Sequence, residues 1–250
     1  MQTTPETHKE TGDGAPAVAT FKANVPVQTS LFDQQIWGLI DYALACERQL
    51  ELVDHVANGR KLETLVFCSH PPVVTLGRTT PKTDLIGWSG SVMETSRGGR
   101  ATYHGPSQLV IYPIVDLRRE DRAGLRERNV GGYIRLLGET VTQLLQESGA
   151  PVELRQGSEN DEQGHTRQLT GVWAGERKVA SIGVAVRKWI TYHGVAINLC
   201  ADEKAFSGIR PCGFKPGTMI SMQELLGKKI SADQLGQRFA QLFEAKLTRS

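Results

Sequence analysis

Cys212 has the sequence surroundings that best suit chemistry. It lies in the segment 209–214, IRPCGF, with a proline before the cysteine and a glycine after it. Proline fixes the backbone φ angle and glycine removes side-chain bulk, so the thiol stands on a constrained turn, outside any periodic apolar element. The thiolate is the reactive form, and a free thiol is only a few per cent thiolate near pH 7. Cys212 is therefore a candidate nucleophile that needs a nearby cation.

Three basic residues are candidates for that cation: Lys178, Arg210 and Lys215. Their positions in the chain do not choose between them. Lys178 is attractive because it opens a strand-like segment with small side chains. Strict alternation along that strand places Lys178 on the face of Ala180, so it reaches the ligand side only if the strand bends or begins after it. A solvated lysine in a turn is the alternative.

The segment 97–100, RGGR, is a second candidate site. Its backbone N–H groups and positive charge suit a phosphate, a carboxylate or a polarised carbonyl, although a solvated turn fits the same residues. Tyr103 and His104 follow directly. The tetrapeptide TYHG recurs at 191–194 with unrelated flanks, so it is not an internal repeat. His104 and His193 are either structural hydrogen-bonding residues or catalysts, and the sequence leaves this open.

Composition excludes several classes of protein. The chain has 250 residues, with 29 Lys and Arg against 27 Asp and Glu, which gives a formal charge of +2. This balance disfavours a DNA-binding protein held by phosphate contacts. No apolar run reaches the roughly 18 residues of a membrane span. The cysteines are too few and too scattered for a disulfide scaffold or a zinc site, so Cys46, Cys68 and Cys200 are interpreted as small core residues. We expect no metal, no nucleic acid and no membrane partner.

The sequence predicts one domain after a short tail. Residues 1–25 are rich in Thr, Glu, Gly, Ala and Pro and lack the pattern of a signal or transit peptide. They are expected to be disordered, in a cytoplasmic protein, and residues 26–250 are expected to form a single domain. A helix is expected to begin at Ser30, followed by apolar residues three or four apart, namely Phe32, Ile36, Ile40, Ala43 and Leu44.

The rest of the chain alternates between strand and helix patterns. Strands are expected at 62–68, 73–76 and 109–114, a helix from Val130 to a stop at Gly149 and Pro151, a loop at 157–168, and a last helix from Ser231. The segment 178–199 is strand-like throughout. One of its faces is apolar, while the other carries only small residues and could form a floor under a ligand: Ser181, Gly183, Ala185, Gly194 and Ala196. One α/β domain with a mixed sheet is expected.

Three segments in the same order resemble one family. They are RGGRATYHGPSQLVIYPIVDL (97–117), GVWAGERKVASIGVAVRKWITYHGVAINL (171–199) and FSGIRPCGF (206–214). They are similar to the lipoyl(octanoyl) transferases, the octanoyl-[acyl-carrier-protein]:protein N-octanoyltransferases of the biotin/lipoate protein ligase superfamily. The similarity runs from about Leu31 to Leu247. The family commonly has Gln at the position of Arg100 and Gly at that of Ser107.

The resemblance implies a fold and an activity. The fold would be an α/β (α+β type) catalytic domain like that of biotin and lipoate protein ligases, a mixed β-sheet flanked by helices. The enzyme would move an octanoyl or lipoyl group from acyl carrier protein, through a cysteine thioester, to a lysine of a lipoyl domain. This is the first step of endogenous protein lipoylation. The acceptors would be the lipoyl domains of 2-oxoacid dehydrogenase complexes and the glycine cleavage H protein, and no cofactor would be needed.

The resemblance also assigns site residues. Cys212 would be the acyl-thioester nucleophile, and Lys178 would lower its pKa and act as general acid and base. A basic rim formed by Arg78, Arg97 and Arg100 would suit an acidic carrier. The substrate-binding residues would be Arg97, Gly98, Gly99, Arg100, Ala101, Thr102, Tyr103, His104, Ser181, Ile182, Gly183, Gly194, Val195 and Ala196.

Three other functions remain open at this point. An ATP-dependent lipoate or biotin protein ligase of the same fold would require ATP and would tolerate loss of the cysteine. A non-catalytic acyl-carrier-binding protein would bind the carrier without turnover. A cysteine hydrolase using Cys212 with His104 would release free octanoate even when an acceptor domain is present.

Overall fold

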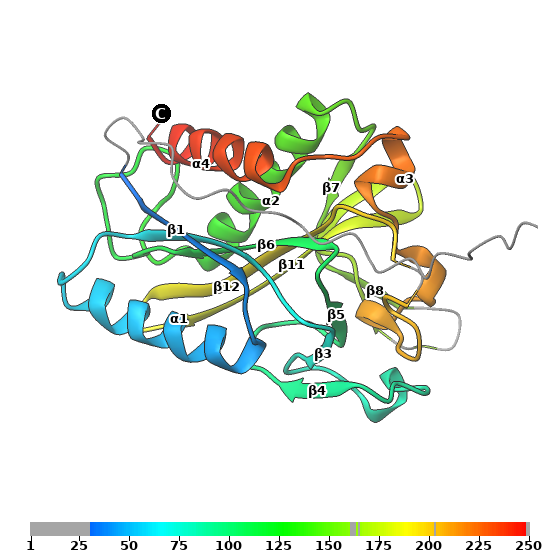
Figure 1. Ribbon diagram of the computed structural model, residues 1–250. Helices are drawn as coiled ribbons and strands as arrows, with labels where there is room; N and C mark the ends of the chain where they lie inside the picture. Colours follow the sequence, from blue (N-terminus) through cyan, green and yellow to red (C-terminus); the bar gives the residue numbers. More distant parts are fainter. Residues whose placement is uncertain (1–30, 161–163, 165, 203, 249–250) are drawn as a thin grey trace, which may run out of the picture.

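A seven-stranded mixed sheet runs through the protein, with helices on both of its faces (Figure 1). The computed structural model describes residues 31–160, 164, 166–202 and 204–248. The tail expected at 1–25 lies outside these residues. The strand order is β1-β2-β6-β12-β11-β10-β7, in which only β1 and β2 are parallel neighbours. The strands of this sheet are β1 (Asp33–Leu39), β2 (Thr64–Ser69), β6 (Gln108–Ile114), β7 (Glu153–Arg155), β10 (Gly171–Ala174), β11 (Arg177–Arg187) and β12 (Ile190–Asn198).

Alternation along the central strands divides the core into two layers. In β2, Leu65 and Phe67 belong to the layer under α2 (Val130–Glu147) and α4 (Ala232–Thr248), whereas Val66 and Cys68 face α1 (Tyr42–Ala57). Successive residues of a strand point to opposite faces, so a strand buried on both sides reads as a continuous apolar run. Figure 1 shows α2 and α4 on one side of the sheet and α1 on the other.

A smaller sheet stands beside α1 on the same side of the main sheet (Figure 1). It has the order β4-β3-β5, with β3 (Val73–Leu76), β4 (Ser91–Glu94) and β5 (Thr102–His104). A third apolar cluster joins it to the C-terminal loops and includes Val74, Tyr103, Trp173, Phe214 and Cys212. The remaining elements are the hairpin of β8 (Ser158–Asn160) and β9 (Thr166–Gln168), helix α3 (Met222–Leu226), and short 3₁₀ turns at Lys82–Asp84, Pro211–Gly213 and Pro216–Thr218.

The helix expected from Ser30 is wrong. Ser30 itself lies outside the described residues, and residues 33–39 form β1, paired in parallel with β2. The first helix begins only at Tyr42, where the Asp41 carboxylate accepts hydrogen bonds from the next turn. The apolar spacing was coincidental, because Phe32 and Ile40 enter different core layers and Ile36 is exposed. Pairing with β2 overrides the local pattern.

The loop expected at 157–168 is also partly wrong, because β8 and β9 pair in antiparallel fashion within it. Residues 161–163 and 165 lie outside the described part. The other expected elements are confirmed: β2, β3, β6, α2, α4 and the paired strands β11 and β12. Gly149 follows α2 with a φ of 96°, the left-handed conformation that favours glycine after a helix. No helix among the described residues combines the length and the apolar character that crossing a bilayer requires.

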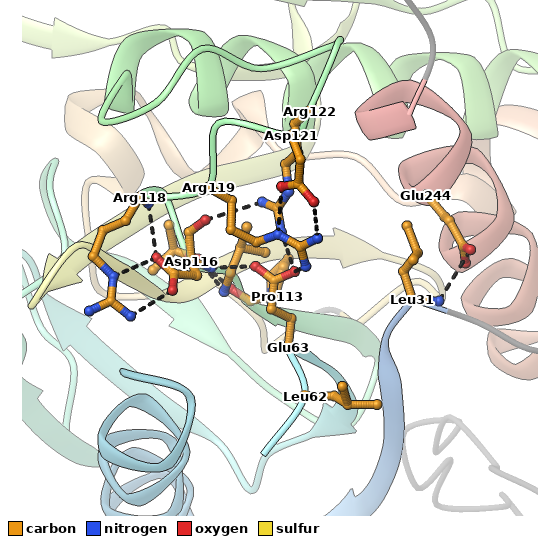
Figure 2. Close-up of polar contacts among 12 residues, drawn as sticks. Leu31, Leu62, Glu63, Pro113, Asp116, Arg118, Arg119, Asp121, Arg122 and Glu244 are labelled. Atoms are coloured by element: carbon orange, nitrogen blue, oxygen red, sulfur yellow. Dashed lines mark hydrogen bonds and ion pairs between the residues drawn. The ribbon is translucent and has the colours of Figure 1, made fainter. Parts of the chain in front are cut away.

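An ion-pair cluster occupies one end of the main sheet, just before β2. Figure 2 shows Arg119 and Arg122 directed at the Glu63 carboxylate, with Asp116 and Arg118 paired beside them. The Glu63 carboxylate also accepts a hydrogen bond from the Asp116 backbone N–H at 2.5 Å. Glu63 is only 5 % exposed, so its charge is compensated by guanidinium groups and a backbone donor rather than by water.

Candidate active site

A pocket lies at the α1-side face of β6, β11 and β12, and the small sheet forms its other wall. Gly183 of β11 pairs directly with Gly194 of β12, and Ser181 pairs with Ala196 in the same way. These small residues line the pocket together with Cys212. A side chain at Gly194 would collide with the backbone oxygen of Ile111, at 2.2 Å from a Cβ. The pocket holds about 490 Å³ of empty space, part of it open to solvent.

The Cys212 turn is held in a strained conformation. Cys212 is the middle residue of the 3₁₀ turn Pro211–Gly213, with φ 55° and ψ 18°, in the left-handed region that non-glycine residues avoid. Its backbone N–H donates to the carbonyl oxygen of Ala101 at 2.8 Å, which ties the turn to the segment before β5. Strain of this kind persists only where the surroundings enforce it, and it is concentrated at functional sites. Cys212 is 7 % exposed.

A β-bulge turns Lys178 toward the pocket. Val172 of β10 pairs with Ala180, but Trp173 pairs with Lys178, so Val179 is one extra residue in β11. Val179 and Ala180 both enter the core layer under α2. The bulge therefore moves Lys178 to the opposite face from the one that strict alternation gives, because an extra residue re-aims the side chains on one side of it.

Lys178 is fully buried beside Cys212. Its Nζ lies 3.7 Å from Cys212 Sγ, donates to the carbonyl oxygen of Gln168 at 3.1 Å, and lies 5.3 Å from the centre of the Trp173 ring. No Asp or Glu among the described residues forms an ion pair with it. Burial lowers the pKa of Lys178 below its usual range, although the neighbouring Cys212 works in the other direction. Burial thus makes the neutral form of this amine easier to reach than it is in an exposed lysine.

A glycine makes room for this lysine. A Cβ at Gly171 would lie 2.4 Å from Lys178 Cε and 2.3 Å from the Ala180 carbonyl oxygen. Any other residue at position 171 would therefore displace the lysine or its strand. The other two candidate cations, Arg210 and Lys215, are exposed. Of the three, Lys178 is the one that the structure places in contact with the thiol.

A chain of hydrogen bonds fixes the tautomer of His104. The Asn198 side-chain amide donates to the Ile220 carbonyl, and Gln108 Nε2 donates to Asn198 Oδ1 and to the Tyr103 carbonyl. Gln108 Oε1 is therefore an acceptor, and His104 Nδ1 must donate to it at 3.1 Å. Burial holds the pKa of His104 well below its usual range, so the ring is neutral. Its Nε2 is left as a bare acceptor on a residue that lines the pocket.

Aromatic and histidine rings line part of the pocket, and the His70 ring packs behind them against His104. Tyr42 stacks on His104, and Tyr112 donates its hydroxyl hydrogen to His70, whose other nitrogen donates to the Ile40 carbonyl. Burial lowers the pKa of His70 to about 4. His193 has a φ of 56°, and its Nδ1 has no hydrogen-bond partner among the described residues. Burial, together with Arg97, lowers the pKa of His193 to about 3, so these rings are uncharged at neutral pH.

The sequence of this chain is similar to those of known proteins over most of its length. The model of the lipoyl protein ligase A/B catalytic domain matches residues 41–244. An octanoyltransferase of Bdellovibrio bacteriovorus is 44 % identical over 205 residues, which cover 82 % of this chain and 93 % of the relative. An octanoyltransferase of Syntrophotalea carbinolica is 39 % identical, covering 84 % of this chain and 92 % of the relative.

This chain belongs to the octanoyltransferase family. Solved structures support its fold at much lower sequence identity. A putative lipoate protein ligase from T. acidophilum with bound lipoic acid superposes with a TM-score of 0.61 at 17 % identity, covering 87 % of each chain. A lipoate-protein ligase A bound with ATP gives 0.58 at 17 % identity, covering 88 % of this chain and 87 % of that one. The expected α/β fold with a mixed sheet flanked by helices is confirmed.

Most of the site residues that the family resemblance indicated lie around one pocket. Thirteen of them line it: Arg97, Gly98, Gly99, Arg100, Thr102, His104, Ser181, Ile182, Gly183, Gly194, Val195, Ala196 and Cys212. Lys178 lies behind Cys212, and Ala101 contributes its carbonyl to the Cys212 turn. Tyr103 points away from the pocket into the third apolar cluster, where its hydroxyl donates to Asp202.

The expected basic rim is wrong for two of its three arginines. Arg97 is buried and donates to the Thr75 carbonyl and hydroxyl at 2.7 Å and to the Arg100 carbonyl at 2.8 Å. Arg100 is buried against the Asp84 carboxylate. Buried guanidinium groups require such partners, and these two find them inside the protein. Only Arg78 is exposed.

The sequence did not indicate several residues that line the pocket of this octanoyltransferase-family chain. They are Tyr42, Val110, Tyr112, Gln168 and Thr170. Tyr42 was obscured by the misplaced first helix. Val110 and Tyr112 belong to an apolar run in β6, in which pocket-facing and core-facing positions look alike. Gln168 lay in the presumed loop, and the polar character of that segment was the only available signal.

Proposed function

We propose that this protein transfers an octanoyl group from an acyl carrier protein, through a thioester on Cys212, to a lysine side chain of a lipoyl domain. The observation that carries the proposal is the buried pair of Cys212 Sγ and Lys178 Nζ, 3.7 Å apart, at a pocket with a floor of small residues. The choice of an octanoyl group rests on the relatives, which are named octanoyltransferases. The thioester, the carrier and the acceptor are our inference.

The pocket has a suitable length for this acyl group. Arg100, just before β5, and Thr102 and His104 of β5 line it, and the Cys212 backbone N–H donates to the carbonyl oxygen of Ala101. Three residues of extended chain from Ala101 to His104 span about 10 Å. An extended eight-carbon chain with bonds near 1.5 Å spans about 9 Å. An octanoyl group attached to Cys212 would therefore reach the His104 and Tyr42 rings with its methyl end.

The first step exchanges one thioester for another. The Lys178 ammonium stabilises the Cys212 thiolate, which attacks the carbonyl carbon of the octanoyl thioester. The new carbon–sulfur bond forms, the bond to the carrier's sulfur breaks, and the departing thiolate takes the proton of Lys178. Because a thioester is broken and a thioester is made, this step needs no nucleotide. Burial has already lowered the pKa of Lys178, which favours release of that proton.

The second step forms an amide. The neutral amine of the acceptor lysine attacks the octanoyl carbon on Cys212, the carbon–sulfur bond breaks, and the amine's extra proton passes to the now neutral Lys178. Lys178 and Cys212 thereby return to the ammonium–thiolate pair that began the cycle. A general base of this kind typically contributes between about 10²-fold and 10⁴-fold to a rate. Lys178 serves as acid and base in turn because its surroundings make both of its forms accessible.

The wider setting belongs to the same proposal. We place the reaction in the cytoplasm, with lipoyl domains of 2-oxoacid dehydrogenase complexes and the glycine cleavage H protein as acceptors. One solved structural neighbour is described as a bipartite lipoate protein ligase and its E2 lipoyl domain from Thermoplasma acidophilum, which supports an acceptor of this class. The free thiols, Cys46, Cys68, Cys200 and Cys212, suit a reducing compartment.

Intact-protein mass spectrometry tests the proposal. The purified protein is mixed with octanoyl-carrier protein in the absence of ATP, and then with a lipoyl domain. We expect one octanoyl adduct on the wild type, none on Cys212→Ala, and chase of the adduct onto the lipoyl domain. Cys68→Ala, which removes a buried thiol elsewhere, serves as the matched control and should keep the adduct.

Three results would contradict the proposal. An adduct that persists on Cys212→Ala would exclude this cysteine as the nucleophile. Transfer that requires ATP would favour a ligase, and release of free octanoate in the presence of a lipoyl domain would favour a hydrolase.

A further inference from the structure

Arg100 and Asp84 form a buried ion pair next to the Cys212 turn. The side chains are 8 % and 0 % exposed. Arg100 Nε donates to Asp84 Oδ2 at 2.9 Å and Nη2 donates to Asp84 Oδ1, the two-pronged geometry in which guanidinium and carboxylate bind most strongly. Arg100 Nη1 donates to the Thr166 carbonyl of β9. All three nitrogens of the guanidinium are thus engaged inside the protein.

These contacts join the segments that carry both members of the dyad. On the Lys178 side, β9 holds Thr166 at one end and Gln168 at the other, and the Gln168 carbonyl accepts the hydrogen bond of Lys178 Nζ. Arg100 therefore anchors the strand that anchors the lysine.

On the Cys212 side, the guanidinium packs directly on Gly213. A Cβ at Gly213 would lie 2.6 Å from Arg100 Nη1, so position 213 must be glycine for this contact to exist. The backbone of Asp84 adds a second tie, because its carbonyl accepts the N–H of Arg210 at 2.8 Å, two residues before Cys212. The pair thus holds both flanks of the turn on which Cys212 adopts its positive φ.

We propose that Arg100 and Asp84 are a positioning pair that fixes the distance and orientation between Cys212 Sγ and Lys178 Nζ. The inference deepens the proposed function, since a thiol and an amine held this way are what acyl transfer needs. It also assigns Arg100 a role other than binding the carrier, because its nitrogens are occupied by Asp84 and Thr166. The strained Cys212 backbone needs such a restraint, because relaxation of the turn would move the thiol away from the lysine.

The rate of Cys212 alkylation by iodoacetamide, followed against pH by intact mass, reports the pair without any acyl substrate. Arg100→Met and Asp84→Asn should shift the midpoint of this profile to higher pH and slow alkylation at pH 7 about tenfold, because the thiolate loses its nearby ammonium. In octanoyl transfer, kcat should fall about 100-fold, as expected for a displacement of about 1 Å, with KM changed much less.

The conservative variant Arg100→Lys separates charge from geometry. It keeps the positive charge but lacks the planar fork that reaches Asp84 and Thr166 together. We expect its alkylation profile to remain shifted. A wild-type profile for Arg100→Lys would overturn the proposal, because charge alone would then suffice. Should Arg100→Met fail to fold, Asp84→Asn, which keeps the shape of the side chain, carries the same test.

Arg122→Gln is the matched control. It also breaks a buried arginine–carboxylate pair, with Glu63, but at the opposite end of the main sheet (Figure 2). It should lower the melting temperature while leaving the Cys212 profile unchanged. An equal shift in Arg122→Gln, or no shift in Arg100→Met and Asp84→Asn, would reduce Arg100 to a general stabilising residue and overturn the proposal. If the variants shift the alkylation profile but the wild type forms no octanoyl adduct, the positioning pair stands and the proposed function is wrong.

Discussion

Two largely buried cations lie at opposite ends of the main sheet and have very different neighbours. Arg122 pairs with the Glu63 carboxylate within a cluster of alternating charges (Figure 2). Lys178 meets a thiol, one carbonyl oxygen and the face of an indole ring. The first cation is matched by a full negative charge. The second has a partner that is negative only when Cys212 is ionised.

Under the proposed function, one buried charge serves stability and the other serves chemistry. In a compensated pair each buried charge has its partner inside the protein, and removing one partner is strongly destabilising. Burial lowers the pKa of the uncompensated Lys178, so its proton is released more easily than that of an exposed lysine, and proton transfer in catalysis uses such a shift. Four experiments test this difference between the two ends of the sheet.

The largest effect is expected from removing the uncompensated cation. Lys178→Met should lower the rate of octanoyl transfer about 1,000-fold, since both proton transfers lose their acid and base. Steady-state transfer to a lipoyl domain measures this, with circular dichroism as the check on folding. Arg122→Gln should keep most of the wild-type rate in its folded fraction. Similar losses in both variants would remove the functional distinction between the two ends.

The next effect concerns stability at the compensated end. Glu63→Gln leaves the guanidinium of Arg122 buried without its countercharge, which should cost about 3 kcal/mol of unfolding free energy. Urea denaturation at pH 7 measures the change, and the alkylation rate of Cys212 serves as the control that should not move. A loss below about 0.5 kcal/mol would mean that the cluster behaves like an exposed ion pair.

Acid should destabilise the pocket end through its neutral histidines. The pKa of His70 is lowered to about 4 by burial, whereas an unfolded histidine titrates near 6.5, so the unfolded chain binds the proton more readily between these values. Stability is then lost as the pH falls from 6.5 to 4, by about 2.6 kcal/mol at pH 4.5 for His70 alone. Denaturation curves at several pH values measure this, and His70→Gln should flatten the dependence. An equally steep dependence in His70→Gln would assign the effect to other groups.

The smallest expected effect has the opposite sign. Lys178→Met should stabilise the protein by about 1 kcal/mol at pH 7, because an apolar side chain suits this site better than an ammonium without a carboxylate. Its folded pKa is lowered, so the wild type gains stability as the pH rises toward the ordinary lysine value of 10.5. The advantage of the variant should therefore shrink over that range. Thermal melts at pH 7 and pH 9.5 measure both points, and a destabilised Lys178→Met at pH 7 would contradict the comparison.

Sequence patterns correctly predicted those parts of the pocket that depend only on residues close together in the chain. The small-residue face of β11 and β12 follows from alternation, so Ser181 and Gly183 could be placed on one side of the sheet from the sequence. The constrained turn of Cys212 followed from its flanking proline and glycine, although its positive φ did not. Such features depend on residues within a few positions of one another.

The parts that failed depend on distant partners. The face of Lys178 is set by a bulge whose register is visible only against β10. Residues 33–39 form a strand because β2 pairs with them from about 30 residues away, where their spacing alone predicted a helix. Arg100 was expected at an exposed rim, and its burial depends on Asp84, a single carboxylate 16 residues earlier. None of these relations leaves a periodic signal in the sequence.

The extra residue in β11, Val179, affects how this lysine can be found in other sequences. Without Val179, β11 would be regular, and alternation alone would place the lysine on the pocket face, opposite Trp173. With Val179, the bulge restores the same placement. Genes that differ by one codon at this position would therefore encode the same lysine–cysteine arrangement, and a genome search with a fixed spacing between the lysine and the Ser-Ile-Gly segment would discard one of the two forms.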